Sequence, residues 1–431
     1  MNNLSNFTKK TILFSVILIF LIFLSFFYFY PLWIEFNQTI NWTLFNYLWT
    51  KVDYWIAIKY FFSCLNYANY KMLYLWHKSS TFLSTIVAVF WTAKEFFQQV
   101  EGPIYLVIFD TPLLMVICLL LSVALMTLIE RLFIGSIQRR SGPAKVGPSG
   151  ILQPFADALK LGIKEPFKPK NANSVMFIFA PIVTLILSLL LWSFVSFDDA
   201  VIVSNPTIAF LFILGISGLN VFTIFTAGWS SNSKFAFLGA LRSVAQMVAY
   251  ELCLGTIVVT ICFATGSYNL NEFMLKQEDQ IFLWTYFGLC YLFFISALAE
   301  TNRHPFDLPE AEAELVSGYN VEYGGMRFAL FFLAEYANIL FMSGLTVILF
   351  LGGWQPIADF FLFDWLPASF WFSIKLVFIV FCFVLVRAAF PRYRYDQLMT
   401  LVWKRLLPLS FGFFVFHVTI NLALGNIIDF I

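Results

Sequence analysis

The chain has 431 residues, of which 60% are hydrophobic and only 12% are charged, and its formal net charge is +1. This composition excludes a soluble globular protein, and a near-neutral chain without a basic tract gives no support to nucleic-acid binding. Apolar runs of about 20 residues, enough for a helix to cross about 30 Å of hydrocarbon, recur along the sequence. We therefore expect an all-α polytopic membrane protein.

The residue types that hold metals and nucleotides are sparse. The six cysteines form no Cys-x-x-Cys motif, and three histidines cannot supply the paired intramembrane ligands of a bis-histidine haem. Walker and Rossmann glycine patterns are also missing. We expect no metal or flavin in this chain, so any redox centre that it serves would lie in other chains.

Residues 1–103 differ in pattern from the rest of the chain. Residues 11–30 form an apolar run without a small-residue cleavage site, which favours a retained transmembrane helix over a signal peptide. Residues 31–103 are rich in Trp, Tyr and Phe but are interrupted by charged and amide side chains. Such a mixture is typical of interfacial or partner-contacting helices. A further helical hairpin is the alternative.

From residue 104 the apolar runs are clearer, and they predict eight core helices. The expected spans are 104–129, 174–197, 207–227, 239–265, 281–299, 326–351, 369–387 and 402–424. No internal repeat is evident, so a duplicated transporter architecture has no support. We interpret residues 104–431 as a core of eight transmembrane helices that follows the N-terminal extension, residues 1–103.

Basic residues alternate between the loops that connect these spans. The loops at 131–170, 228–242, 300–327 and 387–405 hold nearly all of them, whereas the intervening loops hold only Lys276. By the positive-inside rule, the basic loops face the cytoplasm or the mitochondrial matrix.

The first basic loop contains a predicted amphipathic helix at residues 151–165. Leu152, Phe155 and Leu159 recur at helical spacing on one side, and Pro166 stops the pattern. Two interpretations remain open at this point: a surface helix at headgroup depth, or the lip of a cavity that opens to the bilayer.

Ionisable residues within the spans are the next candidates. Glu251 lies about 17 Å from the inner end of its span, and Arg242 is half a turn out of phase with it and about 13 Å away along the axis. An unpaired carboxylate at this depth must face the bundle interior, a partner or water, unless it is hydrogen-bonded only for packing. The same argument applies to Glu335 and Lys375.

Acidic residues are most dense between residues 300 and 322. The six are Glu300, Asp307, Glu310, Glu312, Glu314 and Glu322. If residues 309–317 are helical, Glu310 and Glu314 share a face that is about 200° from Glu312. We expect the first two to face a cavity, where paired burial raises carboxylate pKa values toward neutrality and allows proton exchange. The alternative is a solvated acidic loop.

This acidic stretch, Ala299–Glu314 and on to Tyr323, closely resembles the signature loop of subunit 1 of respiratory complex I (NADH:ubiquinone oxidoreductase). The resemblance runs from about Ile104 to the C-terminus. It includes Glu130-Arg131, Arg140–Pro143, Gln153–Asp157, Lys164–Pro166, Gly228–Lys234, Phe237–Arg242 and Pro391–Met399. The family usually has Lys where this chain has Leu132.

The resemblance implies that eight core helices form most of a ubiquinone tunnel, together with two peripheral subunits. Carried over by motif, the residues at or near the tunnel would be Arg131, Arg140, Phe155, Asp157, Arg242 and Phe332. An acidic path for protons would comprise Glu251, Glu300, Asp307, Glu310, Glu314 and Glu335.

The resemblance also implies a location and partners. The chain would be a multi-pass subunit of the mitochondrial inner membrane, with ubiquinone as substrate. It would contact other membrane subunits, the peripheral-arm subunits at the quinone site, the adjacent iron–sulfur subunit and lipids. Two alternatives are the membrane anchor of an energy-converting hydrogenase and a stand-alone ion carrier. The large basic loops, which suit protein contacts, weigh against the solitary carrier.

Overall fold

The computed structural model describes residues 111–197, 204–278, 281–308, 318–356 and 368–428. The described residues from Val116 onward belong to one compact unit, and the contacts discussed below lie within it. The predicted helix at 11–30, the rest of the 1–103 extension and the acidic segment 309–317 lie outside the described residues.

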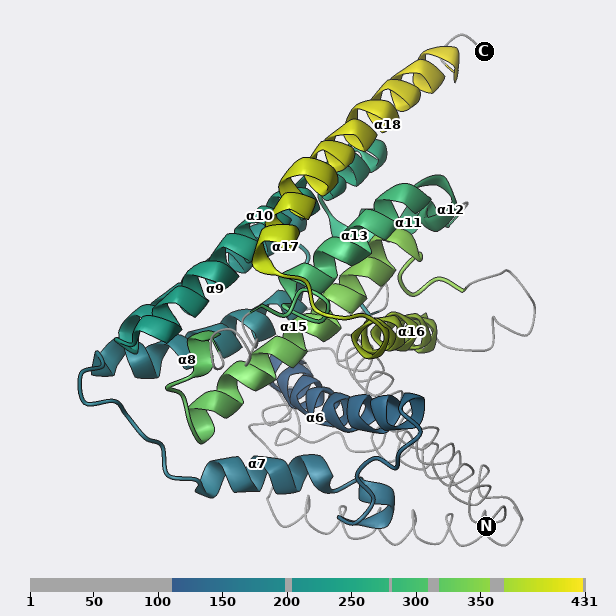
Figure 1. The fold of residues 1–431 in the computed structure, drawn as a ribbon. Coiled ribbons are helices and arrows are strands. Elements are labelled where there is room, and N and C mark those ends of the chain that lie inside the picture. Colours follow the sequence, from purple (N-terminus) through teal and green to yellow (C-terminus); the bar gives the residue numbers. More distant parts are fainter. Residues whose placement is uncertain (1–110, 198–203, 279–280, 309–317, 357–367, 429–431) are drawn as a thin grey trace, which may run out of the picture. The chain divides into compact units, whose positions relative to one another are not determined.

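Seven helices in the described ranges are long and apolar enough to cross a membrane. They are α6 (Thr111–Ile137), α8 (Ser174–Leu191), α9 (Ala209–Ser230), α10 (Lys234–Thr265), α15 (Met326–Phe350), α16 (Ala368–Ala389) and the joined α17 (Tyr395–Leu401) and α18 (Leu407–Ile428) (Figure 1). The shorter helices are α7 (Gln153–Ile163), α11 (Leu270–Leu275), α12 (Phe282–Thr285) and α13 (Phe287–Glu300). The predicted class is confirmed: the chain is an all-α, multi-pass membrane protein.

One predicted span, 281–299, is interrupted rather than continuous. The helix breaks at Tyr286, where φ is −117° and ψ is 34°, and this residue separates α12 from α13. The Tyr286 ring packs against those of Phe282 and His417, with centroids 5.4 and 4.6 Å apart. Because α13 alone rises only about 21 Å, it needs α12 to approach the thickness of a bilayer.

The last transmembrane helix begins earlier than the predicted residue 402. Helix α17 starts at Tyr395 and continues through a wide π-turn, Val402–Leu406, into α18. Pro408 explains the wide turn, because it has no backbone N–H to donate to the preceding turn and its ring crowds that turn. The helix widens at this point and continues.

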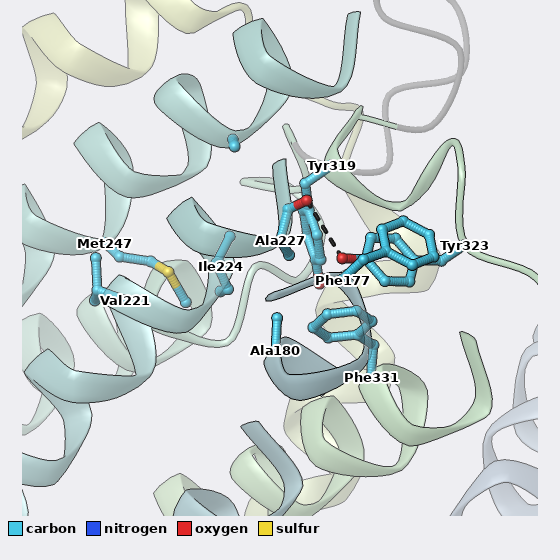
Figure 2. Packing of buried hydrophobic residues seen from close by; sticks show 10 residues of the cluster. Phe177, Ala180, Val221, Ile224, Ala227, Met247, Tyr319, Tyr323 and Phe331 are labelled. Atoms are coloured by element: carbon cyan, nitrogen blue, oxygen red, sulfur yellow. Dashed lines mark hydrogen bonds between the residues drawn. The ribbon is translucent and has the colours of Figure 1, made fainter. Parts of the chain in front are cut away.

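A buried apolar cluster joins α8, α9, α10 and α15 on the side of the basic loops (Figure 2). The rings of Phe177 and Tyr323 stack with centroids 4.1 Å apart. A Cβ atom added to Gly228 would lie 2.3 Å from the Cβ of Ala240, so α9 and α10 pack in close contact at this point. Small residues allow such approach, and the van der Waals contacts that result hold membrane helices together.

A second close approach fixes the end of the acidic loop. A Cβ atom on Gly239 would lie 2.6 Å from the Cα of Gly318. Helix α10 therefore touches the backbone of the 3-10 turn Gly318–Asn320, which follows the 309–317 segment directly.

Candidate functional site

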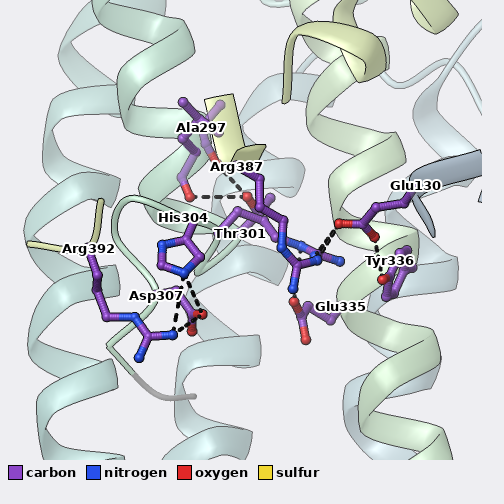
Figure 3. Close-up of polar contacts among 11 residues, drawn as sticks. Glu130, Ala297, Thr301, His304, Asp307, Glu335, Tyr336, Arg387 and Arg392 are labelled. Carbon is purple, nitrogen blue, oxygen red and sulfur yellow. Dashed lines mark hydrogen bonds and ion pairs between the residues drawn. The ribbon is translucent and has the colours of Figure 1, made fainter. Parts of the chain in front are cut away.

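Four segments of the chain bring charged side chains together in one group, partly exposed at Arg387 and Glu335, which we call the arginine–glutamate cluster (Figure 3). Its members are Glu130 near the end of α6, Arg303 after α13, Glu335 and Tyr336 on α15, and Arg387 in the last turn of α16. Each of these positions lies toward the ends of the helices that meet the basic loops. The cluster therefore lies on the side of the basic loops, which is the predicted inner side.

Every member of the arginine–glutamate cluster contacts another member. Arg303 Nη1 lies 3.0 Å from Glu130 Oε1, and Arg387 Nη1 binds the same oxygen. The Tyr336 hydroxyl donates a hydrogen bond to the second oxygen of Glu130. Arg303 Nε lies 3.3 Å from Glu335 Oε1, and its guanidinium lies 4.4 Å from the Tyr336 ring centroid. Two positive and two negative charges thus compensate each other.

Arg303 is the centre of this group. Burial alone would lower the pKa of its guanidinium, but the charges of Glu130 and Glu335 raise that pKa above its ordinary value. Arg303 therefore remains a cation. Its charged guanidinium can stay buried because carboxylates surround it. Its Nη2 atom is buried and has no hydrogen-bond acceptor among the described residues.

Asp307 belongs to a second ion pair beside the cluster. Its Oδ2 atom lies 2.9 Å from Arg392 Nη2 and 4.0 Å from His304 Nε2. Burial lowers the pKa of His304, and the charges of Arg392, Arg387 and Arg303 lower it further, against the opposing effect of Asp307. His304 is therefore neutral near pH 7. These contacts tie the segment after α13 to the segment after α16.

Glu251 and Glu300 share a cavity in the bundle. Glu251 on α10 accepts a hydrogen bond of 2.9 Å from Ser217 on α9, and Glu300 is the last residue of α13. With Asn338 on α15 they line a cavity of about 30 Å³. Glu300 Oε2 and Asn338 Oδ1 are buried without a hydrogen-bond partner in the described chain. Most of the lining is apolar, but a cavity of this size with several polar groups can hold a water molecule that would satisfy such atoms.

Glu251 also lines a second, apolar cavity. This groove of about 440 Å³ lies between α9, α10 and α18, and its other lining includes Leu252, Val259 and Phe411. The carboxylate at the middle of α10 therefore lies between the interior cavity that it shares with Glu300 and an apolar groove.

The predicted amphipathic helix is present as α7, and one ion pair ties it to α6. Arg131 Nη1 lies 2.7 Å from Asp157 Oδ2, and Lys160 Nζ lies 3.3 Å from the other oxygen. Burial alone would raise the pKa of Asp157, but hydrogen bonds and charges of Arg131 and Lys160 lower it. The apolar side chains Phe155 and Leu159 remain exposed within this chain.

The other predicted tunnel residues lie in three separate places. Phe332 on α15 packs between Phe328 and Tyr336, with ring centroids 6.2 and 4.6 Å apart, so it adjoins the arginine–glutamate cluster. Arg140 is exposed after α6, where its Nε donates to Gln138. Arg242 on α10 lies over the Tyr395 ring at 5.6 Å.

Comparison with known proteins decides the family. The model of the NADH dehydrogenase family matches residues 111–418. The chain is 56% identical to NADH-ubiquinone oxidoreductase chain 1 of Arabidopsis thaliana over 292 residues, which are 68% of this chain and 90% of the relative. It is 52% identical to an NADH-quinone oxidoreductase subunit of Rhodospirillum rubrum over 288 residues, 67% of this chain and 86% of the relative. The chain belongs to the subunit 1 family of respiratory complex I.

The resemblance seen in the sequence is thereby confirmed, and the chain is a membrane subunit of an oxidoreductase complex. The family match lies inside the predicted core, 104–431. The boundary of the 1–103 extension, and the roles of individual residues, stay predictions. So does the orientation of Glu310, Glu312 and Glu314, which lie outside the described residues.

Sequence reasoning missed several members of the site in this member of the subunit 1 family. Glu130, Tyr336, Arg387 and Arg392 form its ion pairs and hydrogen bonds, yet none was among the candidate site residues. Charges at the inner ends of apolar spans were the available signal for three of them. Lys375, by contrast, was singled out in the sequence but lies outside the cluster. Its ammonium donates to three backbone carbonyls just after α15, those of Leu351, Gly353 and Gln355.

Proposed function

We propose that this chain forms much of the ubiquinone-binding tunnel of complex I and couples quinone reduction to proton translocation through its buried carboxylates. The observation that carries the proposal is the cavity shared by Glu251 and Glu300, because it joins two bundle acids that no described basic side chain pairs with. A chain of protonatable groups within a membrane bundle is what proton transfer needs.

A tunnel for quinone has support from the apolar and aromatic side chains near α7 and α15. Phe155 and Leu159 expose apolar surface on α7, and the Phe328–Phe332–Tyr336 ladder leads to Arg303. An isoprenoid substrate suits such surfaces, and the Arg303 Nη2 donor suits a quinone oxygen. The names of the two relatives given above describe them as oxidoreductases of NADH with ubiquinone or quinone.

Quinone reduction takes two electrons and two protons, and the electrons would come from an iron–sulfur subunit beside the membrane. This chain's part is electrostatic. The negative charge that arrives on reduced quinone changes the protonation of Asp307, Glu310 and Glu314, and the change passes to Glu251 and Glu335. The complex would work in the mitochondrial inner membrane, as the match to a plant chain supports.

The test uses complex I in sealed membrane vesicles. We expect Glu251→Gln combined with Glu300→Gln to lower NADH-driven proton pumping by about tenfold or more, since amides cannot carry the proton. Glu272→Gln, an exposed acid of α11, is the matched control and should pump normally. Unchanged pumping in the double variant would falsify the proposed path.

A further inference from the structure

We infer that Gln246 is a positioning residue, which sets the distance between α10 and the segment that carries Glu300, Arg303 and Asp307. The inference rests on the proposed function, since it concerns the alignment of the same carboxylates. It assigns a role to a residue whose side-chain hydrogen bonds, among the described residues, go to two backbone carbonyls.

Gln246 reaches two backbone carbonyls at once. It is fully buried, and its Nε2 donates to the carbonyl oxygens of Ala299 at 2.9 Å and Phe306 at 2.8 Å. A side-chain amide has two N–H groups, so both are used, and two carbonyl acceptors fix which end of the amide faces them. The side chain therefore holds both ends of the 300–305 turn at a fixed separation.

This turn is otherwise weakly constrained by regular structure. It follows the C-terminus of α13, and Asn302 has a left-handed φ of 52°. Its internal backbone bonds are short-range, such as that from Phe306 N to Arg303 O at 2.8 Å. Side chains from other segments therefore help to hold its shape, as the partners of Arg303 and Asp307 do. Gln246 provides two such contacts from one side chain.

The same helix carries Glu251. Five positions separate it from Gln246, which is a rotation of about 140° around α10. One side of α10 therefore binds the turn through Gln246. Another side carries Glu251, which faces Ser217 and the cavity shared with Glu300. Because Gln246 and Glu251 lie on the same helix, the Gln246 bonds to Ala299 and Phe306 contribute to how far Glu300 lies from Glu251.

The test compares two glutamines in the assembled complex. Gln246→Met keeps the volume but removes both bonds. The matched control is Gln277→Met, because Gln277 is equally buried and its Nε2 also donates to two carbonyls, of Phe273 and Ile348, far from the candidate site. The readouts are kcat and KM for a short-chain quinone per assembled complex, with NADH oxidation by ferricyanide as the reference.

We expect Gln246→Met to lower kcat by about tenfold to a hundredfold, the effect of misplacing a reacting group by about 1 Å. The KM and the ferricyanide rate should stay unchanged. Gln246→Glu, which keeps the shape and can donate at most one hydrogen bond, should give an intermediate kcat. Gln277→Met should lower the amount of complex without changing its kcat.

Three results would overturn the inference: an unchanged kcat in Gln246→Met, an equal loss of kcat in both methionine variants, or failure of both Gln246 variants to assemble, which would make the role one of folding. The proposed proton path fails separately. Normal pumping in Glu251→Gln with Glu300→Gln would reject that path, whatever the Gln246 variants do.

Discussion

Removal of Arg303 is the sharpest single test of the arginine–glutamate cluster. In Arg303→Met, Glu130 keeps Arg387 and the Tyr336 hydroxyl, but Glu335 loses its contact at 3.3 Å. The formal charge of the cluster changes from zero to −1. Because Arg303 and Glu130 are both buried, solvent screens little of this loss.

The expected cost follows from burial. Breaking a buried ion pair by removal of one partner typically costs about 3–5 kcal/mol, since the remaining charge stays desolvated. At about 1.4 kcal/mol per factor of ten, the ratio of intact to locally opened structure falls by about 100-fold to several thousand-fold. Adding Glu335→Gln restores the formal charge to zero, and we expect it to recover about 1–3 kcal/mol.

The assay is heat inactivation of NADH:quinone reductase activity in purified, detergent-solubilised complex at matched protein amounts. Arg405→Met, which removes an exposed arginine in the π-turn, is the control and should inactivate at the unmodified rate. The reasoning is refuted if Arg303→Met inactivates no faster than this control. It is also refuted if the added Glu335→Gln speeds inactivation further.

Three other substitutions test neighbouring contacts. In Gly239→Ala the new Cβ lies 2.6 Å from the Cα of Gly318, so we expect a loss of about 1–3 kcal/mol of stability, seen as faster heat inactivation. The control Gly255→Ala on the same helix meets nothing within 4 Å and should leave stability nearly unchanged. Asp157→Asn weakens the partly exposed attachment of α7 to α6, and the amide exchange of α7 should quicken by no more than about fivefold, or 1 kcal/mol. Because burial and arginine charges lower the pKa of His304, its contribution to stability is complete above about pH 6.5 and is lost as the pH falls through the lowered value. His304→Asn should therefore flatten the acid-side loss of heat stability below about pH 6.5, and an unchanged slope would contradict this assignment.

Helix positions were predictable because they depend on local signals. Apolar length located the spans, whereas the orientation that the basic loops indicate stays a prediction. The break at Tyr286 was not predictable, because the residue continues an apolar run and leaves helical geometry where its ring packs on His417 from a distant helix. The early start at Tyr395 was not predictable for a different reason: residues 395–401 are too polar to be recognised as part of a span.

The candidate site was predictable in residue type but not in pairing. The density of acids marked the region after residue 299, and helical phase separated Glu251 from Arg242. No spacing rule could join Glu130 to Arg303 or Arg387, which follow it by 173 and 257 positions. Such pairs depend on which helix ends meet, and that is a property of the whole bundle.

The pairing divides the acids of this chain into two kinds. Glu130 is bound by the buried Arg303 at 3.0 Å, so loss of its charge would leave a buried cation uncompensated, at a cost of about 3–5 kcal/mol. Asp307 is bound by Arg392 at 2.9 Å, but Arg392 is exposed, so solvent lowers the corresponding cost. Glu251 and Glu300 have no such ion pair with any described residue and share a cavity instead. They can therefore change protonation without breaking an ion pair. Glu335 stands between the two kinds, because its arginine partner also serves Glu130. The proton path that we propose therefore runs through Glu251 and Glu300, while Glu130 keeps its charge beside the buried Arg303.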